Sequence, residues 1–547
     1  MSNHLYYGDN LDVLREHIKD ESVDLVYLDP PFNSDANYNI LFQSPTGQKS
    51  EAQIEAFQDT WHWNDTAEKA FDDVMQSGNT DAAELLRTLR RFLRENDMMA
   101  YLTMIAVRLL ELHRVLKPTG SLYLHCDPTA SHYLKVLLDS VFSPRHFLNE
   151  ITWKRTNSHN TARKYGNVAD IILFYSKSDD YQWIQQYTSY SDAQLSRYKM
   201  DENGKLYTGQ DLTASRPDSS SGKFEWRGTK PSDNRGWGYT LDQLEKWWTE
   251  GKILTRKDGT PRMDGLKVYL DDMPGQPLQS VWTDIERIAN TSKERLGYPT
   301  QKPLALLERI ILASSNPGDV VLDPFCGCGT ATHAAQKLER AWIGIDITHL
   351  AISLIEKRLN DAFPGIAYDV HGTPKDVEGA RALAASDKYQ FQWWAVSLVN
   401  AVPFGGRKKG ADGGIDGHIY FKPDGRTTEK AVVSVKGGEN VNVAMIRDLA
   451  HVIEREGAKI GVFITLAEPT QPMIAEAATV GIYKTEYGEF PRLQILTIAE
   501  LFEGKKPLMP WIDSSAFKKA EREDTSTSKQ GTMNLEGTKE GAIGRKK

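Results

Sequence analysis

The sequence predicts an α/β fold in which an open, largely parallel sheet carries functional residues at the carboxyl ends of its strands. Residues 23–28 form a short apolar run, rich in branched and aromatic side chains, that stops at Asp29; this pattern is typical of a buried strand. Residues 320–322 form a second run, which leads into a glycine-rich loop and an expected helix, and residues 341–345 form a third, which ends in Asp346. Ligands of such sheets bind in the crevice outside the carboxyl ends of the strands, so these strand ends are the candidate site.

The first strand end has groups that can hold an amino group of a nucleic-acid base. The carboxylate of Asp29 and the backbone carbonyl of Pro30 can accept hydrogen bonds from the amine at one point. Pro31 and Phe32 complete the segment, and the ring of Phe32 can stack on a base that has left the duplex. The alternative is purely structural: a strand followed by a proline turn that begins the next helix.

The second strand end has the parts of a nucleotide-type cofactor loop. Gly327 and Gly329 lack side chains, so the backbone can approach a ligand at the start of the following helix. Asp346, at the end of the next strand, is placed to bind the two hydroxyls of a ribose. An NAD enzyme is the alternative for this half, but the third glycine of the dinucleotide fingerprint is absent, and such an enzyme would leave the segment at Asp29 without a purpose.

Taken together, these segments resemble the S-adenosylmethionine-dependent DNA amino-methyltransferases of the permuted β-class. The resemblance runs from about residue 5 to about residue 363 and includes residues 8–10, 29–34, 298–303 and 323–330. It implies a permuted Rossmann-like fold, S-adenosyl-L-methionine as cofactor and double-stranded DNA as substrate. The residues that it implies at the catalytic end are Asp29, Pro30, Pro31 and Phe32. Those that it implies around the cofactor are Asp9, Asn10, Lys302, Pro303, Asp323, Pro324, Phe325, Cys326, Gly327, Gly329, Thr330 and Asp346, with Lys302 and Pro303 beside the methionine end.

Within this family the sequence favours the N6 amine of adenine as the target. Members that methylate the N4 amine of cytosine more often begin the tetrapeptide with serine, whereas this chain has Asp29. The reaction implied is a direct displacement at the sulfonium methyl, which needs no cysteine nucleophile. Cys326 and Cys328 are therefore interpreted as small loop residues, and three cysteines fall short of the four ligands of a structural zinc site, so no metal is expected in the methyltransferase.

The whole chain has 547 residues and a formal net charge of -8. Its length suggests about three folded units. Three cysteines fit a reducing compartment, and without a membrane-spanning run or a signal peptide we expect a cytoplasmic protein. Because the net charge is negative, contact with DNA must come from local basic patches. The candidates beside the expected base pocket are Lys154, Arg155, Arg163 and Lys164.

The predicted methyltransferase is interrupted by a region of different composition. The catalytic half spans residues 1–155 and the cofactor-binding half residues 298–372. Between them, residues 156–297 lose the periodic apolar signal and gain tryptophan, glycine, proline and charge; the resemblance implies a target-recognition region here. Only 169–177 reads clearly as a strand, which we assign to the catalytic sheet.

Residues 385–512 resemble the Mrr-like branch of the restriction-endonuclease fold, a second and smaller α/β domain. Asp416 and Lys436 match that family's first acid, which could hold Mg²⁺, and its lysine. Ser434, however, stands where the family carries Glu, Asp or Gln, so cleavage would need another acid, for which Glu439 and Asp448 are candidates. The module is either an active Mg²⁺-dependent nuclease or a DNA-binding scaffold, and residues 513–547 are expected to be a disordered tail.

The sequence thus favours a site-specific DNA methyltransferase in a restriction-modification or defence context. The alternatives are a bifunctional enzyme that also cleaves DNA, an N4-cytosine methyltransferase, and a DNA-binding protein without activity. A homodimer or a restriction-modification partner subunit is compatible with each of the enzymatic interpretations.

Overall fold

The computed structural model describes residues 2–31, 37–43, 49–58, 62–156, 163, 165–215, 222–289, 292–296, 298, 300–404, 414–424, 426–510 and 523. For residues 37–43 and 49–58 it describes the backbone only. Phe32, Lys164 and, apart from residue 523, the predicted tail at 513–547 lie outside these ranges.

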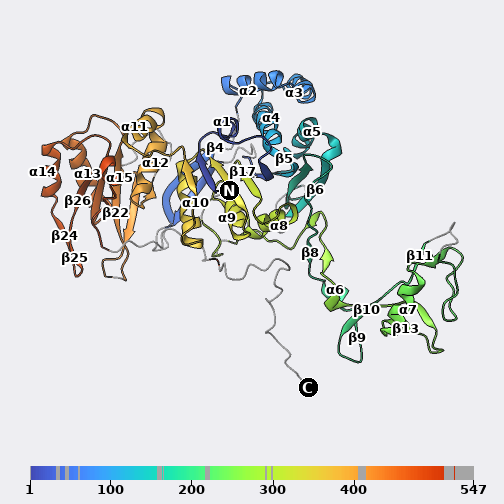
Figure 1. Cartoon of the computed structure of the whole chain (residues 1–547). Helices are drawn as coiled ribbons and strands as arrows, with labels where there is room; N and C mark the ends of the chain where they lie inside the picture. The colour runs from blue at the N-terminus through green and yellow to red at the C-terminus, as the bar shows by residue number, and fades with distance from the viewer. Residues whose placement is uncertain are drawn as a thin grey trace. The chain divides into compact units, whose positions relative to one another are not determined.

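A nine-stranded mixed sheet organises the first part of the chain (Figure 1). In spatial order its strands are β16 (Val281–Trp282), β6 (Phe147–Lys154), β7 (Ala169–Ser176), β5 (Leu116–Cys126), β2 (Val23–Leu28), β17 (Val320–Asp323), β18 (Ala341–Asp346), β1 (His4–Tyr7) and β19 (Asp369–His371). β7 runs antiparallel to both β5 and β6, and the other neighbours are parallel. The predicted α/β class and the strand at 169–177 are confirmed.

The strand order creates a crevice between β2 and β17. From β2 the chain continues to its neighbour β5 on one side, whereas from β17 it continues to β18 on the other. The connections diverge where β2 and β17 pair, at Val26 and Leu322. A reversal of this kind leaves the carboxyl ends of the two strands uncovered, which is where open sheets bind ligands. β1, the first strand in sequence, lies next to β18, as a permuted order requires.

Helices join and cover the strands of this sheet. They are α1 (Asn10–His17), α2 (Asp65–Gln76), α3 (Thr80–Leu93), α4 (Asp97–Val115), α5 (Ser131–Phe142), α8 (Leu304–Ser314), α9 (Thr330–Lys337) and α10 (His349–Ala362), with a 3-10 turn η1 (Pro144–His146) and a separate hairpin of β3 (Asn37–Gln43) and β4 (Lys49–Gln58). α4 is the central one: it is buried on almost every face and belongs to the main hydrophobic core. A helix that is apolar all round is typical of such a position.

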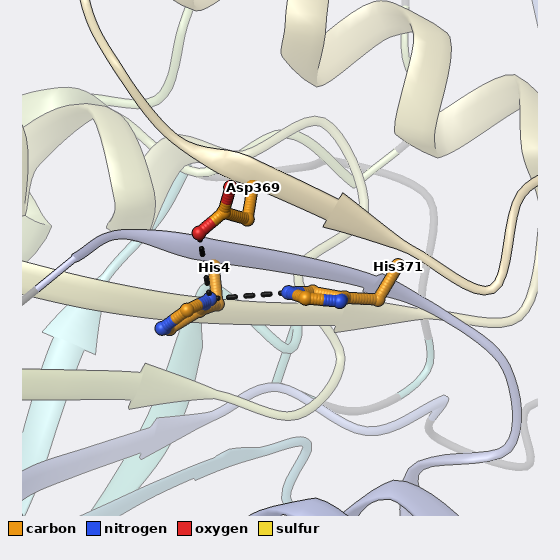
Figure 2. A group of neighbouring side chains, drawn as sticks. All are labelled: His4, Asp369 and His371. Carbon is orange, nitrogen blue, oxygen red and sulfur yellow. Dashed lines mark hydrogen bonds and ion pairs between the residues drawn. The ribbon is translucent and has the colours of Figure 1, made fainter.

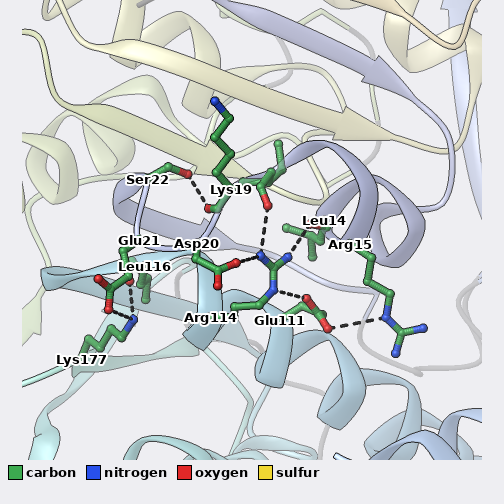
Figure 3. A network of polar contacts seen from close by, with 11 residues as sticks. Leu14, Arg15, Lys19, Asp20, Glu21, Ser22, Glu111, Arg114, Leu116 and Lys177 are labelled. Atoms are coloured by element: carbon green, nitrogen blue, oxygen red, sulfur yellow. Dashed lines mark hydrogen bonds and ion pairs between the residues drawn. The ribbon is translucent and has the colours of Figure 1, made fainter.

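Arg114, in the last turn of α4, fixes the end of α1 (Figure 3). Its guanidinium donates to the carbonyls of Leu14 (2.6 Å) and Ile18 (3.1 Å), and it pairs with Glu111 (2.7 Å) and Asp20. The last carbonyls of a helix have no partner within the helix, so an arginine at this point satisfies them. α1 is thereby held against α4 at the side of the sheet that carries Asp9 and Asn10.

The outer edge of the sheet carries a paired set of polar side chains (Figure 2). His4 on β1 is in register with Asp369 on β19, and its Nδ1 lies 3.1 Å from Nε2 of His371. Their ligand atoms lie within 4.8 Å of one another, as in a metal site. The direct hydrogen bond between the two imidazoles accounts for their approach, and Asp369 is 63% exposed, so we assign no ion to this group.

Residues 185–279 form a compact unit of their own, narrower than the predicted region 156–297. It contains a four-stranded antiparallel sheet in the order β13 (Ile253–Thr255), β14 (Pro261–Tyr269), β10 (Leu206–Gln210) and β9 (Lys199–Met200), and the helices α6 (Asp192–Leu195) and α7 (Leu241–Thr249). Two short pairs, β11 (Thr213–Ser215) with β12 (Arg235–Trp237) and β8 (Tyr187–Thr188) with β15 (Gln276–Pro277), and a 3-10 turn η2 (Leu270–Asp272) complete it. The sequence did not predict these strands because most have two to five residues, too few to show alternation. Trp226 and Trp237 are buried in the core of the unit.

The C-terminal module has a five-stranded sheet between helices. Its order is β20 (Val402–Pro403), β21 (Gly417–Phe421), β22 (Glu429–Lys436), β23 (Ile460–Thr465) and β26 (Leu493–Thr497), and β24 (Ile482–Thr485) pairs with β25 (Gly488–Pro491). The helices are α11 (Val377–Ser386), α12 (Lys388–Leu398), α13 (Val443–Arg455), α14 (Gln471–Thr479) and α15 (Ile498–Phe502). The predicted second α/β domain is confirmed.

Candidate active site

A single cavity of about 270 Å³ lies at the carboxyl ends of β2 and β17. The segment after β2 contributes Asp29 and Pro31, β17 contributes its last residue, Asp323, and the loop after β17 contributes Gly327. The two segments therefore close over one space although nearly 300 positions separate them in the sequence. The other predicted residues that line it are Asp9, Asn10, Lys302, Pro324, Phe325, Cys326, Thr330 and Asp346. Pro30, Pro303 and Gly329 are close in sequence but are not lining residues.

The loop between β17 and α9 depends on two glycines. Gly327 and Gly329 have φ of +49° and +73°, in the left-handed region that glycine adopts without strain. A Cβ on Gly329 would lie 2.8 Å from Cγ1 of Ile355, and one on Gly327 would lie 3.1 Å from the ring of Tyr298. Neither position has room for a side chain, so this turn of the loop requires glycine at both; of the two, Gly327 lines the cavity.

Asp346 stabilises the loop and faces the cavity. Its Oδ2 accepts a hydrogen bond from the backbone N–H of Gly327 (2.9 Å), and its Oδ1 accepts from the N–H and hydroxyl of Thr348 (both 2.9 Å). Burial raises the pKa of this carboxyl to about 6, against the lowering effect of these hydrogen bonds. Burial also raises the pKa of Asp323 well above its usual range, and the nearby charges of Asp29 and Asp346 act in the same direction.

Arg108 on α4 joins the start of α1 to the cofactor loop. The side chain is 3% exposed; it donates to both carboxylate oxygens of Asp9 (2.9 and 3.1 Å) and to Oδ1 of Asn10 (2.5 Å). Nδ2 of Asn10 in turn donates to the carbonyl of Pro324 (2.7 Å). Asp9 and Asn10 thus act as an orienting link between α1 and the loop, and not only as wall residues.

The end of the cavity at Asp29 contains an ion pair. Lys302, buried at the entry to α8, donates through Nζ to Oδ2 of Asp29. The resemblance implies a position for Lys302 beside the methionine end of the cofactor; its partner in the structure is Asp29, the predicted catalytic carboxylate. A buried charge is stable only when paired, so each of these residues holds the other in place.

The three cysteines are buried thiols without disulfide bonds. Burial raises the pKa of Cys126, Cys326 and Cys328, which keeps them protonated near neutral pH. A protonated thiol is a weak nucleophile, in agreement with their interpretation as small structural residues.

The predicted DNA-contacting residues are only partly described. Lys154, at the end of β6, and Arg163 are exposed. Arg155 is half-exposed, and its Nε lies 3.5 Å from a carboxylate oxygen of Asp170. Arg155 therefore has a structural partner as well as an accessible surface.

In the C-terminal module, Asp416 and Lys436 lie on adjacent segments of the sheet. Asp416, just before β21, is buried and accepts a hydrogen bond from the backbone N–H of Val435 (2.6 Å), next to Lys436 at the end of β22. Ser434 is buried on the same strand. Glu439 pairs with Arg381 (3.2 Å) and Asp448 is an exposed residue of α13. Among the residues described, no group of three His, Cys, Asp or Glu ligand atoms gathers at Asp416.

The sequence assigned no site role to several residues that line the cavity, among them Tyr27, Arg108 and Thr348, and it named Tyr298 only as part of the segment 298–303. Arg108 carried a signal, because a charged residue inside an otherwise apolar helical stretch is rarely buried without a functional partner. The others are ordinary strand or loop residues whose role depends on tertiary contacts.

In the described part of the chain, no helix is long and apolar enough to cross a bilayer.

Residues 23–357 match the model of a family described as DNA methylase, and residues 383–485 match a restriction endonuclease model. The chain is 30% identical over 362 residues to the type II methyltransferase M.EcaI of Enterobacter cloacae, an alignment that covers 65% of this chain and 69% of the relative.

Two further relatives are named as enzymes of the same kind. The Mod subunit of the type III restriction-modification enzyme StyLTI of Salmonella typhimurium is 27% identical over 60% of this chain, which spans about half (49%) of that relative. The DNA adenine methyltransferase YhdJ of Escherichia coli is 26% identical over 65% of this chain and 83% of its own length. Among solved structures, a complex of M1.HpyAVI with its cofactor is 16% identical and covers 65% of this chain and 98% of the neighbour, with a TM-score of 0.32.

Proposed function

The chain belongs to the DNA methylase family, and from this premise we propose that it transfers a methyl group from S-adenosyl-L-methionine to the exocyclic amine of adenine in duplex DNA. The observation that carries the proposal is the shared cavity: the glycine loop after β17 and Asp29 after β2 line one space. A cofactor held by the first would face a base held by the second.

The residues on the cofactor side fit this ligand. Asp346 presents a carboxylate beside the N–H of Gly327, an arrangement suited to ribose hydroxyls, and Gly327 itself lines the cavity. When bound, S-adenosyl-L-methionine supplies an electrophilic methyl on a sulfonium sulfur. Asp323 and the Arg108 network hold the loop in this shape.

On the substrate side, we assign the acceptor role to Asp29 and Pro30. An exocyclic amine is a poor nucleophile because its lone pair is delocalised into the ring, and acceptors for its hydrogens draw the nitrogen toward a geometry that can attack. The ion pair with Lys302 holds the Asp29 carboxylate in place for this task. Phe32 would stack on the extruded base.

Adenine is favoured over cytosine on two grounds. The tetrapeptide begins with Asp29 in place of serine, and one relative is named as a DNA adenine methyltransferase. The test is mass spectrometry of nucleosides from unmethylated plasmid DNA incubated with the purified chain and the cofactor. N6-methyladenine supports the proposal, N4-methylcytosine redirects it, and the absence of both refutes it.

We further propose that residues 185–279 carry target recognition. They form a separate compact unit inserted in the sequence between β7 and β16 of the catalytic sheet. Their buried tryptophans stabilise the unit, so sequence reading must come from exposed polar or charged side chains. Single-molecule sequencing of DNA from cells that express the chain would give the recognition sequence, and exchange of this segment should change it.

DNA cleavage by the C-terminal module is the second candidate function. Residues 383–485 match a restriction endonuclease model, and Asp416 lies against the strand that carries Lys436. Mg²⁺ in such a site takes several oxygen ligands, and the buried Ser434 is a weaker one than a carboxylate. Incubation of unmethylated plasmid with Mg²⁺, with Asp416→Asn as control, decides the matter: cutting that requires Asp416 supports a nuclease, and an intact plasmid leaves a DNA-binding module.

Partner proteins are proposed on the basis of one relative. StyLTI Mod is named as a subunit of a larger enzyme, so a separate restriction subunit or a second copy of this chain is expected to join the complex. Mass photometry of the chain with and without DNA would distinguish a monomer from a homodimer.

A further inference from the structure

A line of three buried polar residues leads away from the cavity behind Asp29. Tyr27 lies on β2 two residues before Asp29 and lines the cavity, His125 lies on the neighbouring β5, and Asp170 lies on β7, the next strand along. Their exposed fractions are 2%, 0% and 1%. The hydroxyl of Tyr27 lies 3.0 Å from Nδ1 of His125, and Nε2 of His125 lies 3.1 Å from Oδ2 of Asp170.

The direction of each hydrogen bond in this line follows from the carboxylate of Asp170 at its end. An ionised carboxylate only accepts hydrogen bonds, so Nε2 of a neutral His125 must donate to Asp170, which leaves Nδ1 as an acceptor. The hydroxyl of Tyr27 must then donate to Nδ1. Because its hydrogen is directed at His125, the phenol oxygen has acceptor capacity to offer the cavity that Tyr27 lines.

The surroundings hold the three side chains in place and keep His125 and Tyr27 neutral at rest. The ring of Trp153 packs edge-on against His125 at 5.7 Å between centroids, and its indole N–H is itself fixed on the carbonyl of Ile285 (2.9 Å). The charged groups that face His125 are Asp170, Asp29 and Lys302; burial and the Lys302 charge lower the pKa of His125, against the two carboxylates. Burial raises the pKa of Tyr27 well above its usual range.

We propose that Tyr27 accepts a proton from the target amine during methyl transfer, with His125 and Asp170 as positioning residues. This role rests on the proposed function. As the nitrogen–methyl bond forms, the bond between that methyl and sulfur breaks with its electron pair on sulfur, and the amine nitrogen becomes acidic. One amine proton passes to the Tyr27 oxygen while the phenol proton passes to Nδ1 of His125. The imidazolium then stands beside the Asp170 carboxylate, which Arg155 also faces (3.5 Å). After product release the proton returns through Tyr27 to water in the open cavity.

The placement of the line assigns a different task to Asp29. Its carboxylate is held by the ammonium of Lys302, so it orients the amine by accepting a hydrogen bond. Tyr27 is a neutral acceptor, and its own phenol proton can pass to Nδ1 of His125. This division is the arrangement of general-base catalysis in which a third group orients the base.

The test compares two tyrosine variants in the full-length chain. Tyr27→Phe removes the hydroxyl at the cavity; Tyr123→Phe is the matched control, because Tyr123 is its register partner on β5, is equally buried and loses one hydrogen bond, to Ser314 (2.7 Å), outside the cavity. The measurements are single-turnover transfer of labelled methyl to DNA, calorimetric affinity for S-adenosyl-L-methionine, and melting temperature. We expect Tyr27→Phe to slow transfer about 100-fold with unchanged cofactor affinity, and Tyr123→Phe to transfer at the wild-type rate.

The pH profile separates a proton-accepting role from a structural one. The rate is measured with S-adenosyl-L-methionine saturating at every pH, so that cofactor affinity does not limit it. In the wild type this single-turnover rate should fall on the acidic side, below the ordinary imidazole pKa, because a protonated His125 cannot receive the Tyr27 proton. Tyr27→Phe should lose this limb, and Asp170→Asn should be slow although it binds cofactor. Equal rates for the two phenylalanine variants, or an acidic limb that persists in Tyr27→Phe, would overturn the role of Tyr27. A wild type that transfers no methyl to DNA would instead overturn the proposed function.

Discussion

Replacement of Arg108 by methionine tests the link between α1 and the cofactor loop. Arg108 is 3% exposed and makes hydrogen bonds to Asp9, to Asn10 and to the carbonyl of Met104 (2.9 Å). Methionine fills a similar volume, so the change removes the charge and its donors without a large cavity. Removal of one partner from a buried pair costs about 3–5 kcal/mol. Asp9 is 39% exposed and can regain water, which places the expected loss near the lower end, about 3 kcal/mol.

The same variant should weaken the cofactor site. Without Arg108, Asn10 is no longer oriented to donate to the carbonyl of Pro324, and the loop after β17 loses one of its fixed points. We expect at least a tenfold weaker affinity for S-adenosyl-L-methionine, about 1.4 kcal/mol, measured by titration calorimetry beside a denaturation experiment. Arg87→Met is the matched control, since Arg87 is 53% exposed and pairs weakly with Glu84 at 3.7 Å. Unchanged stability and affinity in Arg108→Met would refute the reasoning.

Three other changes have defined outcomes. Burial raises the pKa of Asp346 to about 6, so the contribution of this group to stability is present below the unfolded pKa near 4 and is lost as pH rises through 6. Ribose binding needs the ionised carboxylate and is lost as pH falls through 6, so cofactor affinity should rise from pH 5 to pH 8. A flat affinity profile, or the same profile in Asp346→Asn, would contradict this. Gly329→Ala should lower the free energy of unfolding by about 2–4 kcal/mol, because the left-handed backbone disfavours alanine and the new Cβ would contact Ile355. Gly438→Ala is the control, because nothing lies within 4 Å of its added Cβ. Equal melting temperatures of the two variants would exclude strain at Gly329. Lys302→Met should reduce methyl transfer at least tenfold, because Asp29 loses its ion-pair partner, with a smaller effect on cofactor affinity. A larger loss of cofactor affinity than of methyl transfer would place Lys302 at the cofactor, as the resemblance implied.

The sequence predicted the strand ends of the site but not the contacts that join them. Asp29, Gly327 and Asp346 follow apolar strands that can be recognised one at a time, and parallel strands bring their carboxyl ends to one edge. That β2 and β17 are direct neighbours is a property of the long-range pairing, which local periodicity does not encode.

The residues that were missed are those whose role depends on a distant partner. Tyr27 looks like any aromatic strand residue until His125 and Asp170 are placed beside it by pairing of β2 with β5 and of β5 with β7. The short strands of the unit at 185–279 were missed for a different reason, since turns and paired tryptophans hold them more than alternation does. In the C-terminal module, the sequence predicted that Ser434 weakens a metal site at Asp416; the structure buries Ser434 on the strand whose Val435 N–H donates to Asp416, and the effect on cleavage stays a prediction.

The central claim is that one cavity brings a methyl donor and an extruded amine together, with binding on the β17 side and acceptance on the β2 side. Asp29→Asn separates cofactor binding from amine acceptance most directly. The amide keeps the shape of the side chain but loses the carboxylate that faces Lys302. The measurement is transfer of labelled methyl from S-adenosyl-L-methionine to duplex DNA, with cofactor affinity determined on the same preparation. We predict that the variant binds the cofactor within a fewfold of the wild type and transfers methyl at least 100-fold more slowly. Wild-type transfer by Asp29→Asn would contradict the account.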